Sequence, residues 1–205
     1  LAGFKRVHLC HQPTALEEMP RLTKALNGPR LWIKRDDCTG LATGGNKTRK
    51  LEFLMADALE LGADIVVTQG AVQSNHVRQT AAAACKLGID CYALLERRVP
   101  KESAEYEQTG NVLFDRMFNT KIEFRPAGLD MNAEAKAVTE RLKSEGRNAY
   151  FIPGGGSNEI GALGYVSTAQ ELLEQCKAMR IHPKLVVLST GLSLIHISEP
   201  TRPQC

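Results

Sequence analysis

Hydrophobic and polar positions alternate along this chain between short apolar runs and longer amphipathic stretches. The apolar runs are typical of buried strands and cover residues 63–70, 90–96, 121–125, 149–153 and 184–190. The amphipathic stretches are typical of helices and cover residues 76–88, 105–118, 131–146 and 157–179. One more helix is expected within residues 43–62. Strands and helices that alternate over short links predict an α/β fold with a parallel sheet and right-handed crossovers.

Composition narrows the class of protein. The 205 residues are 43% hydrophobic and 24% charged, which is typical of a soluble globular chain of one large or two small domains. A net charge of +3, scattered Lys and Arg and only 5% aromatic residues argue against a nucleic-acid surface. No apolar run reaches the roughly 18 residues of a membrane span. Six cysteines without CxxC spacing argue against a metal site or disulfide framework and favour the cytoplasm.

The turn before the first long helix carries the strongest candidate chemistry. Gly44 and Gly45 permit a tight turn, and Asn46 is expected to cap the helix that follows. Lys47 then falls in the first helical turn, where the helix dipole disfavours a cation and favours the neutral amine of a Schiff-base nucleophile. Lys50 lies on the same face and could meet an anion such as a phosphate. A solvated basic helix start is the alternative.

A nucleotide-binding P-loop is the rival interpretation of this turn. The motif requires Gly-x-x-x-x-Gly-Lys-[Ser/Thr]. Gly40 and Gly45 have that spacing, but Asn46 stands where the motif needs lysine. The sequence therefore argues against nucleotide hydrolysis.

Two further turns carry polar or glycine-rich clusters. Ser74, Asn75 and His76 open the helix at 76–88, where backbone N–H groups can hold a carboxylate or phosphate; a simple helix cap is the alternative. No Gly-x-Ser-x-Gly elbow of a hydrolase surrounds Ser74. Three glycines at 154–156 do not form a dinucleotide motif, because Glu159 stands at the last glycine position. They predict either a pocket wall or a flexible crossover between domains.

Several stretches together resemble the D-cysteine desulfhydrase and 1-aminocyclopropane-1-carboxylate deaminase family over residues 4–191. They are PTALE (13–17), WIKRDD (32–37), TGGNKTRKLEFL (43–54), GAVQSNHVRQTAAAA (70–84), GNVLFDR (110–116) and IPGGGSNEIGALGY (152–165). L-cysteate sulfo-lyase, a relative, is similar to residues 37–50. The resemblance implies a tryptophan synthase β-like fold (fold type II), with pyridoxal 5'-phosphate as cofactor. It further implies a small α/β domain at 50–155, inserted between incomplete large-domain portions at 1–49 and 156–191, and a homodimeric parent.

The resemblance also implies roles for particular residues. Lys47 matches the lysine that holds the cofactor and shuttles the α-proton, and Lys50 matches a residue near the phosphate. Ser74 matches a nucleophile or substrate-carboxylate contact, and Asn75 matches the asparagine beside the ring hydroxyl. Thr190 and Gly191 are expected to be what remains of a phosphate-binding loop.

The activity implied is α,β-elimination from a small β-substituted alanine. D-cysteine would give pyruvate, sulfide and ammonia, and L-cysteate would give pyruvate, sulfite and ammonia. Cyclopropane-ring-opening deamination and an inactive truncated fragment are the alternatives. Residues 192–202, LSLIHISEPTR, resemble the translation of a sequencing adapter, so residues 192–205 are interpreted as a non-native tail.

Overall fold

A four-stranded parallel sheet organises the part of the chain between residues 65 and 151. The computed structural model describes residues 1, 3–99 and 103–188. The strands β3 (Ile65–Ala71), β4 (Asp90–Arg97), β5 (Lys121–Pro126) and β6 (Ala149–Phe151) lie in the order β5-β4-β3-β6, and every pair is parallel. A separate antiparallel pair joins β1 (Leu16–Glu18) to β2 (Trp32–Lys34). The predicted α/β fold with a parallel sheet is confirmed.

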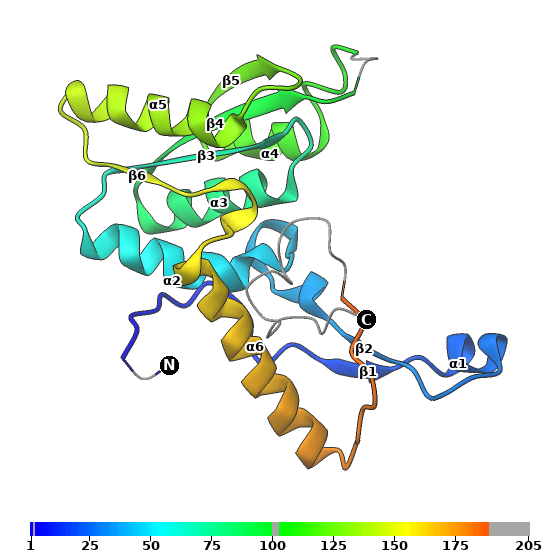
Figure 1. Ribbon diagram of the computed structural model, residues 1–205. Coiled ribbons are helices and arrows are strands. Elements are labelled where there is room, and N and C mark those ends of the chain that lie inside the picture. The colour runs from blue at the N-terminus through cyan, green and yellow to red at the C-terminus, as the bar shows by residue number, and fades with distance from the viewer. Residues whose placement is uncertain (2, 100–102, 189–205) are drawn as a thin grey trace, which may run out of the picture.

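Helices cover both faces of this sheet, as Figure 1 shows. The α-helices are α1 (Pro20–Leu26), α2 (Lys47–Glu60), α3 (Asn75–Leu87), α4 (Gly110–Met117), α5 (Met131–Ser144) and α6 (Glu159–Ala178). Among the described residues, short 3₁₀ helices are η1 (Asp36–Cys38), η2 (Leu41–Thr43) and η3 (Gly154–Gly156). Helix α5 lies on one face, and α3 and α4 lie on the other (Figure 1). Beyond α3, α2 packs against α6.

The core follows the alternation of side chains along β3. Ile65 and Val67 pack with α5 residues such as Val138, whereas Val66 packs with α2 and α3 residues such as Leu54. A strand covered on both faces reads as a continuous apolar run, because neither set of side chains meets water. None of the helices in the described part of the chain is long and apolar enough to cross a membrane.

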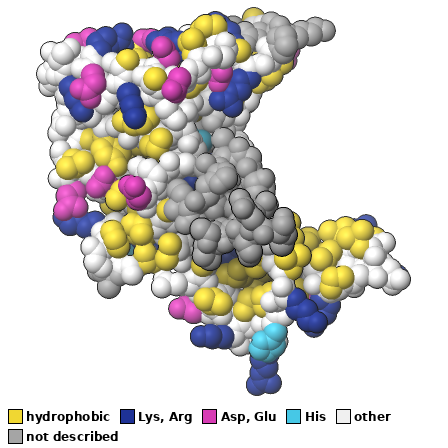
Figure 2. Space-filling view, viewed as in Figure 1, with side chains coloured by type: hydrophobic (Ala, Val, Ile, Leu, Met, Phe, Trp, Pro, Cys, Tyr) yellow, Lys and Arg dark blue, Asp and Glu magenta, His cyan; other side chains and the backbone are white. Residues whose placement is uncertain are grey.

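Surface charge is mixed on the face shown in Figure 2. Over the sheet, Lys and Arg side chains alternate with Asp and Glu (Figure 2). Some hydrophobic side chains lie at the left of the view, and others gather over α1 and the β1–β2 pair at the lower right (Figure 2). The latter include Leu22, Leu26 and Ile33, all of which are exposed.

Two predicted elements differ from the structure. Residues 184–188 form no strand; no described strand pairs with them, and Leu185 and Val187 are 78% and 84% exposed. Their apolar pattern cannot make a strand without a neighbour to accept its backbone hydrogen bonds. Residues 105–109 form turns instead of helix. The backbone at Gly110, with φ of +60°, interrupts the helical path there, and α4 begins at that residue.

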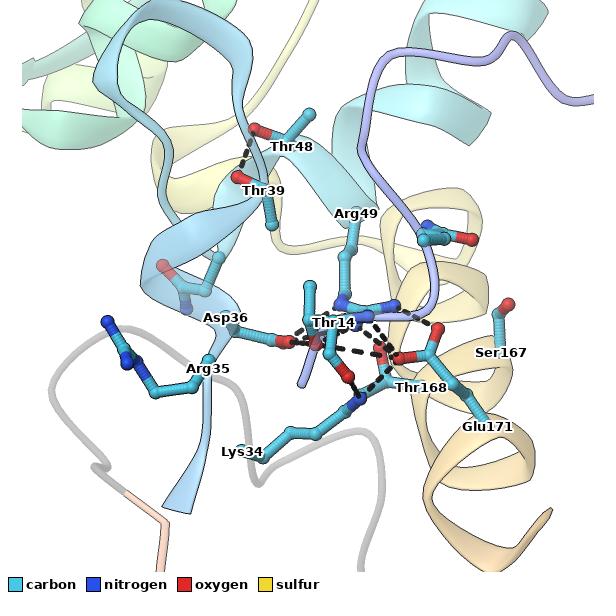
Figure 3. Close-up of polar contacts among 12 residues, drawn as sticks. Thr14, Lys34, Arg35, Asp36, Thr39, Thr48, Arg49, Ser167, Thr168 and Glu171 are labelled. Carbon is cyan, nitrogen blue, oxygen red and sulfur yellow. Dashed lines mark hydrogen bonds and ion pairs between the residues drawn. The ribbon is translucent and has the colours of Figure 1, made fainter. Parts of the chain in front are cut away.

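A buried charge network fixes the position of α2 (Figure 3). The Arg49 side chain, 1% exposed, donates to both Asp36 oxygens at 2.9 and 2.8 Å and to both Glu171 oxygens at 3.0 and 2.9 Å. Arg49 also donates to the hydroxyl of Thr14 at 2.9 Å, and the Lys34 ammonium contacts Glu171 from the other side. The network therefore joins η1, α2 and α6 with the segment before β1.

Close packing of α6 supports the same position of α2. A Cβ atom added at Gly164 would lie 2.3 Å from the Arg49 carbonyl oxygen, so glycine alone permits this approach. Arg49 is separated from Lys47 and Lys50 around the helix by its 3.6-residue period. Holding Arg49 therefore turns the two lysines toward the sheet side of α2.

Glu171→Gln is expected to flatten the loss of stability in acid. Burial alone would raise the pKa of Glu171, but hydrogen bonds from Arg49 and Lys34 outweigh it and lower the pKa from 4.5 to about 2. Between these values the unfolded chain binds more protons, so the wild-type free energy of unfolding falls as pH falls from 4.5 toward 2. Glu171→Gln lacks this contribution. Urea unfolding at several pH values measures the slope, with exposed Glu174→Gln as control; parallel curves for wild type and Glu171→Gln would contradict the expectation.

Candidate functional site

The turn that precedes α2 is built so that only glycine fits. Gly44 and Gly45 have φ of +81° and +134°. A Cβ atom at Gly45 would lie 2.5 Å from Nε2 of Gln79. The Thr39 hydroxyl accepts from the Gly45 N–H and donates to the Gly45 carbonyl, both at 2.8 Å. The turn is therefore rigid and delivers Lys47 to the first position of α2.

Lys47 is buried without a polar partner. Its residue is 4% exposed, and its amine makes no hydrogen bond or ion pair with any residue that the structure describes. Burial lowers the pKa of Lys47, because the charged form is penalised outside water. The expectation of an easily deprotonated lysine agrees with this, although burial is the main cause and the helix dipole was the predicted one.

Asn46 does not cap the helix in the predicted way. It occupies the position before α2, but its backbone is already helical, with φ of −63° and ψ of −23°, and its side chain accepts no helix N–H. A side-chain cap requires an extended backbone at that position. The Asn46 amide donates instead to the Tyr165 hydroxyl at 2.9 Å. Asn46 therefore links the start of α2 to α6.

Lys50 lies one turn further along α2 and faces the glycine-rich turn after β6. Its ammonium donates to the Gly155 carbonyl at 3.2 Å and to the Ser157 hydroxyl at 3.0 Å. Burial, and then repulsion from Lys47, lower the pKa of Lys50 to about 8. Gly155 and Gly156 are buried, and Gly156 lies against Leu54 and Lys50 of α2, so this turn is packed and not a flexible crossover. The pocket wall stays a prediction.

His76 lies buried behind the two lysines. Its Nε2 atom is 2.9 Å from the Thr68 hydroxyl, which itself donates to the Ile152 carbonyl at 2.9 Å. Since Thr68 has one proton and gives it to Ile152, Nε2 of His76 must be the protonated nitrogen. Burial, followed by Lys47 and Lys50, lowers the pKa of His76 to about 3. The ring is therefore neutral, and its buried Nδ1 lone pair has no partner in the described part of the chain.

Ser74 and Asn75 begin helix α3. Ser74 is the N-cap residue, and its hydroxyl oxygen accepts from the Val77 N–H at 3.3 Å, so the capping role is confirmed. No residue that the structure describes accepts its hydroxyl proton. Asn75 is exposed at the first position of α3.

Gln79 brings the two helix starts together. Its amide oxygen accepts from the backbone N–H and the hydroxyl of Thr48, both at 3.0 Å, and its Nε2 donates to the Asn75 carbonyl at 2.9 Å. The start of α2, with Lys47, and the start of α3, with Asn75, are therefore bridged by one side chain. Sequence reasoning missed Gln79, Thr68 and Tyr165, although each lies in or beside a glycine-containing stretch that it had singled out. Thr190, Gly191 and the tail 192–205 lie outside the described residues.

The family is decided by comparison with known proteins. The profile of the family described as "Pyridoxal-phosphate dependent enzyme" matches residues 7–195. The chain belongs to this family. This match, together with the relatives described next, confirms the resemblance that the motifs carried and the fold expected from it.

Individual relatives narrow the similarity within the pyridoxal-phosphate-dependent family. The chain is 47% identical over 196 residues to a D-cysteine desulfhydrase of Salmonella typhi, which covers 96% of the chain and 59% of that relative. A crystal structure of an ACC deaminase homologue is 41% identical, with a TM-score of 0.76 over 85% of this chain and 52% of that one. A threonine deaminase of T.th., at 20% identity and TM-score 0.61 over 83% and 48% of the two chains, shares the fold alone. The chain thus spans about half to three fifths of these relatives.

The described residues fit pyridoxal phosphate. The cofactor has an aldehyde that a neutral amine attacks, and Lys47 offers a buried amine without a partner. It also has a phosphate and a ring oxygen, which need donors. The N-terminus of α3, the free hydroxyl proton of Ser74 and the ammonium of Lys50 are such donors. The clustering of this amine with these donors is the chemistry that the family requires.

Proposed function

We propose that the whole protein is a pyridoxal-phosphate-dependent lyase that acts on D-cysteine and releases pyruvate, sulfide and ammonia. The observation that carries the proposal is Lys47, a buried amine with a lowered pKa at the start of a helix. The 47% identity to a D-cysteine desulfhydrase supports the substrate. When bound, the cofactor supplies an electron sink for the carbanion left by loss of the α-proton. L-cysteate is the alternative substrate of the same reaction.

Lys47 is proposed to bond to the cofactor aldehyde and to carry the α-proton. Its burial supports both roles, because each needs the amine in its neutral form for part of the cycle. Lys50 is proposed to hold the phosphate. An approaching dianion would favour its charged form and oppose the effect of burial on its pKa. We also propose that Thr190 and Gly191 contribute to the phosphate site.

Ser74 is proposed to contact the substrate carboxylate, and Asn75 the ring oxygen. Both begin α3, where free backbone N–H groups favour anions. We further propose that residues 50–155 are a small domain between large-domain portions at 1–49 and 156–191. The four-stranded sheet between residues 65 and 151 supports this division. A cytoplasmic homodimer is proposed for the whole protein.

A second candidate function is deamination of 1-aminocyclopropane-1-carboxylate. The 41% identity to an ACC deaminase homologue supports it. The deciding experiment incubates the whole protein with D-cysteine, L-cysteate and the cyclopropane amino acid in turn. Pyruvate with sulfide from D-cysteine is the expected result. Pyruvate with sulfite from L-cysteate, or 2-oxobutyrate from the cyclopropane, as the faster reaction would replace the proposal by the corresponding alternative.

Ser74→Ala is expected to lower turnover by about tenfold or more, since a charge-assisted hydrogen bond contributes about 1.5–3 kcal/mol. The visible absorption band of bound cofactor should remain, because Lys47 is untouched. Steady-state kinetics and an absorption spectrum of the same sample measure both effects.

The control for Ser74→Ala must separate the loss of a helix cap from the loss of a contact with the substrate. Asp130 caps α5 by accepting from the N–H groups of Asn132 and Ala133, both at 3.1 Å. Asp130→Ala should therefore lose similar stability, about 1 kcal/mol, without losing turnover. Unchanged turnover in Ser74→Ala would reduce Ser74 to its capping role.

A further inference from the structure

Asn111, the second residue of α4, holds the loop that carries Ser74 and Asn75. Its backbone N–H donates to the Gln73 side-chain oxygen at 2.8 Å, and its Nδ2 donates to the Gln73 carbonyl at 2.8 Å. The same Nδ2 donates to Oδ1 of Asn75 at 3.0 Å. Asn111 thus binds the backbone of this loop and the side chains on either side of Ser74, those of Gln73 and Asn75, which precede it by 38 and 36 residues.

Two partners fix which way the Asn111 carboxamide points. Nη1 of Arg78 donates to Oδ1 of Asn111 at 3.0 Å, and a guanidinium can only donate. The Gln73 carbonyl can only accept, so it must face Nδ2 of Asn111. The reversed carboxamide would set two donors against each other at Arg78 and two acceptors against each other at Gln73. The orientation of Asn111 therefore follows from its partners alone.

The orientation of Asn111 determines that of Asn75. Because Nδ2 of Asn111 is a donor, Asn75 must turn its acceptor, Oδ1, toward it. The NH₂ group of Asn75 then lies on the opposite side of the planar carboxamide. It makes no hydrogen bond with the residues that the structure describes, and Asn75 is exposed. The loop therefore presents a pair of amide donors at the start of α3.

We propose that Asn111 is a positioning residue that keeps the NH₂ group of Asn75 directed at the cofactor ring oxygen. This inference rests on the proposed function, which places that oxygen beside Asn75. A ring oxygen that carries negative charge accepts from an amide N–H and is repelled by an amide oxygen. A free asparagine can present either end, whereas Asn75 held by Asn111 presents only the donor.

Arg78 extends the same network to the lysine. Its Nη2 atom donates to the Gly44 carbonyl at 2.7 Å, in the rigid turn before Lys47. One guanidinium therefore connects the turn that places Lys47 with the residue that orients Asn75. The Lys47 amine and the NH₂ group of Asn75 are therefore held in fixed positions relative to each other, as a site for one planar ligand requires.

Two substitutions at Asn111 separate positioning from simple structural support. Asn111→Asp keeps the shape of the side chain and the acceptor for Arg78. Because its second oxygen can only accept, Asn75 must turn its NH₂ group toward residue 111 and its own oxygen toward the cofactor ring. Asn111→Ala only releases Asn75, which can still adopt the productive orientation. The affinity of the apoprotein for pyridoxal phosphate, followed by the visible band, should fall about tenfold or more in Asn111→Asp and less in Asn111→Ala. Asn111→Asp also sets a carboxylate oxygen against the Gln73 carbonyl, which could disturb the loop whatever Asn75 does. A structural effect of this kind would lower the affinity in the Asn75→Ala background as well, whereas an effect through Asn75 would not.

A double-mutant cycle and a matched control complete the test. Asn75→Ala should weaken cofactor binding by itself, and adding Asn111→Asp to it should change the affinity less than about twofold. Asn148→Asp is the control, since its Nδ2 likewise donates to two carbonyls, of Leu61 and Gly62 at 2.9 and 2.8 Å, far along the chain from the site. Its affinity for the cofactor should equal that of wild type.

The possible outcomes are distinct. If wild type forms no visible band with pyridoxal phosphate, the proposed function fails, and the inference fails with it. If wild type forms the band but Asn111→Ala binds the cofactor more weakly than Asn111→Asp, only the role of Asn111 is overturned. If circular dichroism shows that Asn111→Asp is unfolded, NMR signals of the side-chain amides in the wild-type protein test the inference instead. On cofactor binding, the NH₂ resonances of Asn75 should shift more than those of Asn111, and an unshifted Asn75 pair would overturn the inference.

Discussion

Lys47→Ala is expected to lose the visible absorption of bound cofactor and to lower turnover about a thousandfold or more, because proton transfer by a positioned side chain alone contributes 10²- to 10⁴-fold. The substitution removes the one buried amine that has no partner among the described residues and a lowered pKa at the helix start. Borohydride reduction followed by peptide mass spectrometry should find the cofactor on residue 47 of wild type.

Lys47→Arg is the matched control for this prediction. It keeps a long basic side chain at the start of α2, but a guanidinium stays protonated and forms no bond with the cofactor aldehyde. It should therefore be as inactive as Lys47→Ala. Cofactor found on Lys50 of either variant after reduction would move the attachment to the second lysine, whose pKa of about 8 also leaves some neutral amine.

Arg49→Met is expected to lower the free energy of unfolding by about 3–5 kcal/mol, the usual effect of removing one partner from a buried charge network. Asp36 and Glu171 would then face each other, with side chains only 15% and 12% exposed, and with Lys34 as the remaining cation on Glu171. Urea unfolding at neutral pH measures the change.

The control for Arg49→Met also removes the Glu171 carboxylate, one of the two charges that lose Arg49 as their partner. Adding Glu171→Gln to Arg49→Met should restore part of the lost stability, because the two changes share one network and are not additive. A loss under about 1 kcal/mol for Arg49→Met would show that the network behaves like an exposed ion pair.

The sequence predicted features that depend on neighbouring residues. The strand at 90–96 and the helix at 131–146 appear within one or two residues of their expected ends, as β4 (Asp90–Arg97) and α5 (Met131–Ser144). A parallel strand covered on both faces gives an unbroken apolar run, and a helix gives its own period. The place of Lys47 at a helix start also followed from its local glycines.

Features that depend on distant residues could not be predicted in the same way. Lys47, Arg49 and Lys50 look like a solvated basic helix start, yet all three are buried. Arg49 is stabilised by Glu171, which is 122 residues away, and no local sequence pattern predicts that pairing. The stretch containing Asn111 was recognised as a motif, but its contact with Asn75 depends on how α4 packs against α3. Residues 184–188 show the reverse case, in which an apolar pattern finds no described neighbour.

The contact between Lys50 and the Gly155 carbonyl also bears on the order of folding. The two residues are 105 positions apart, whereas β3, α3 and β4 follow one another directly. The entropic cost of closing a loop grows only slowly with its length, so the separation has little effect on stability. Contacts between distant segments nevertheless form slowly during folding. The β3–α3–β4 unit can therefore assemble before β6 arrives and brings η3 onto α2. Until that late step Lys50 lacks its contacts with Gly155 and Ser157, so this part of the candidate site is completed only as folding ends.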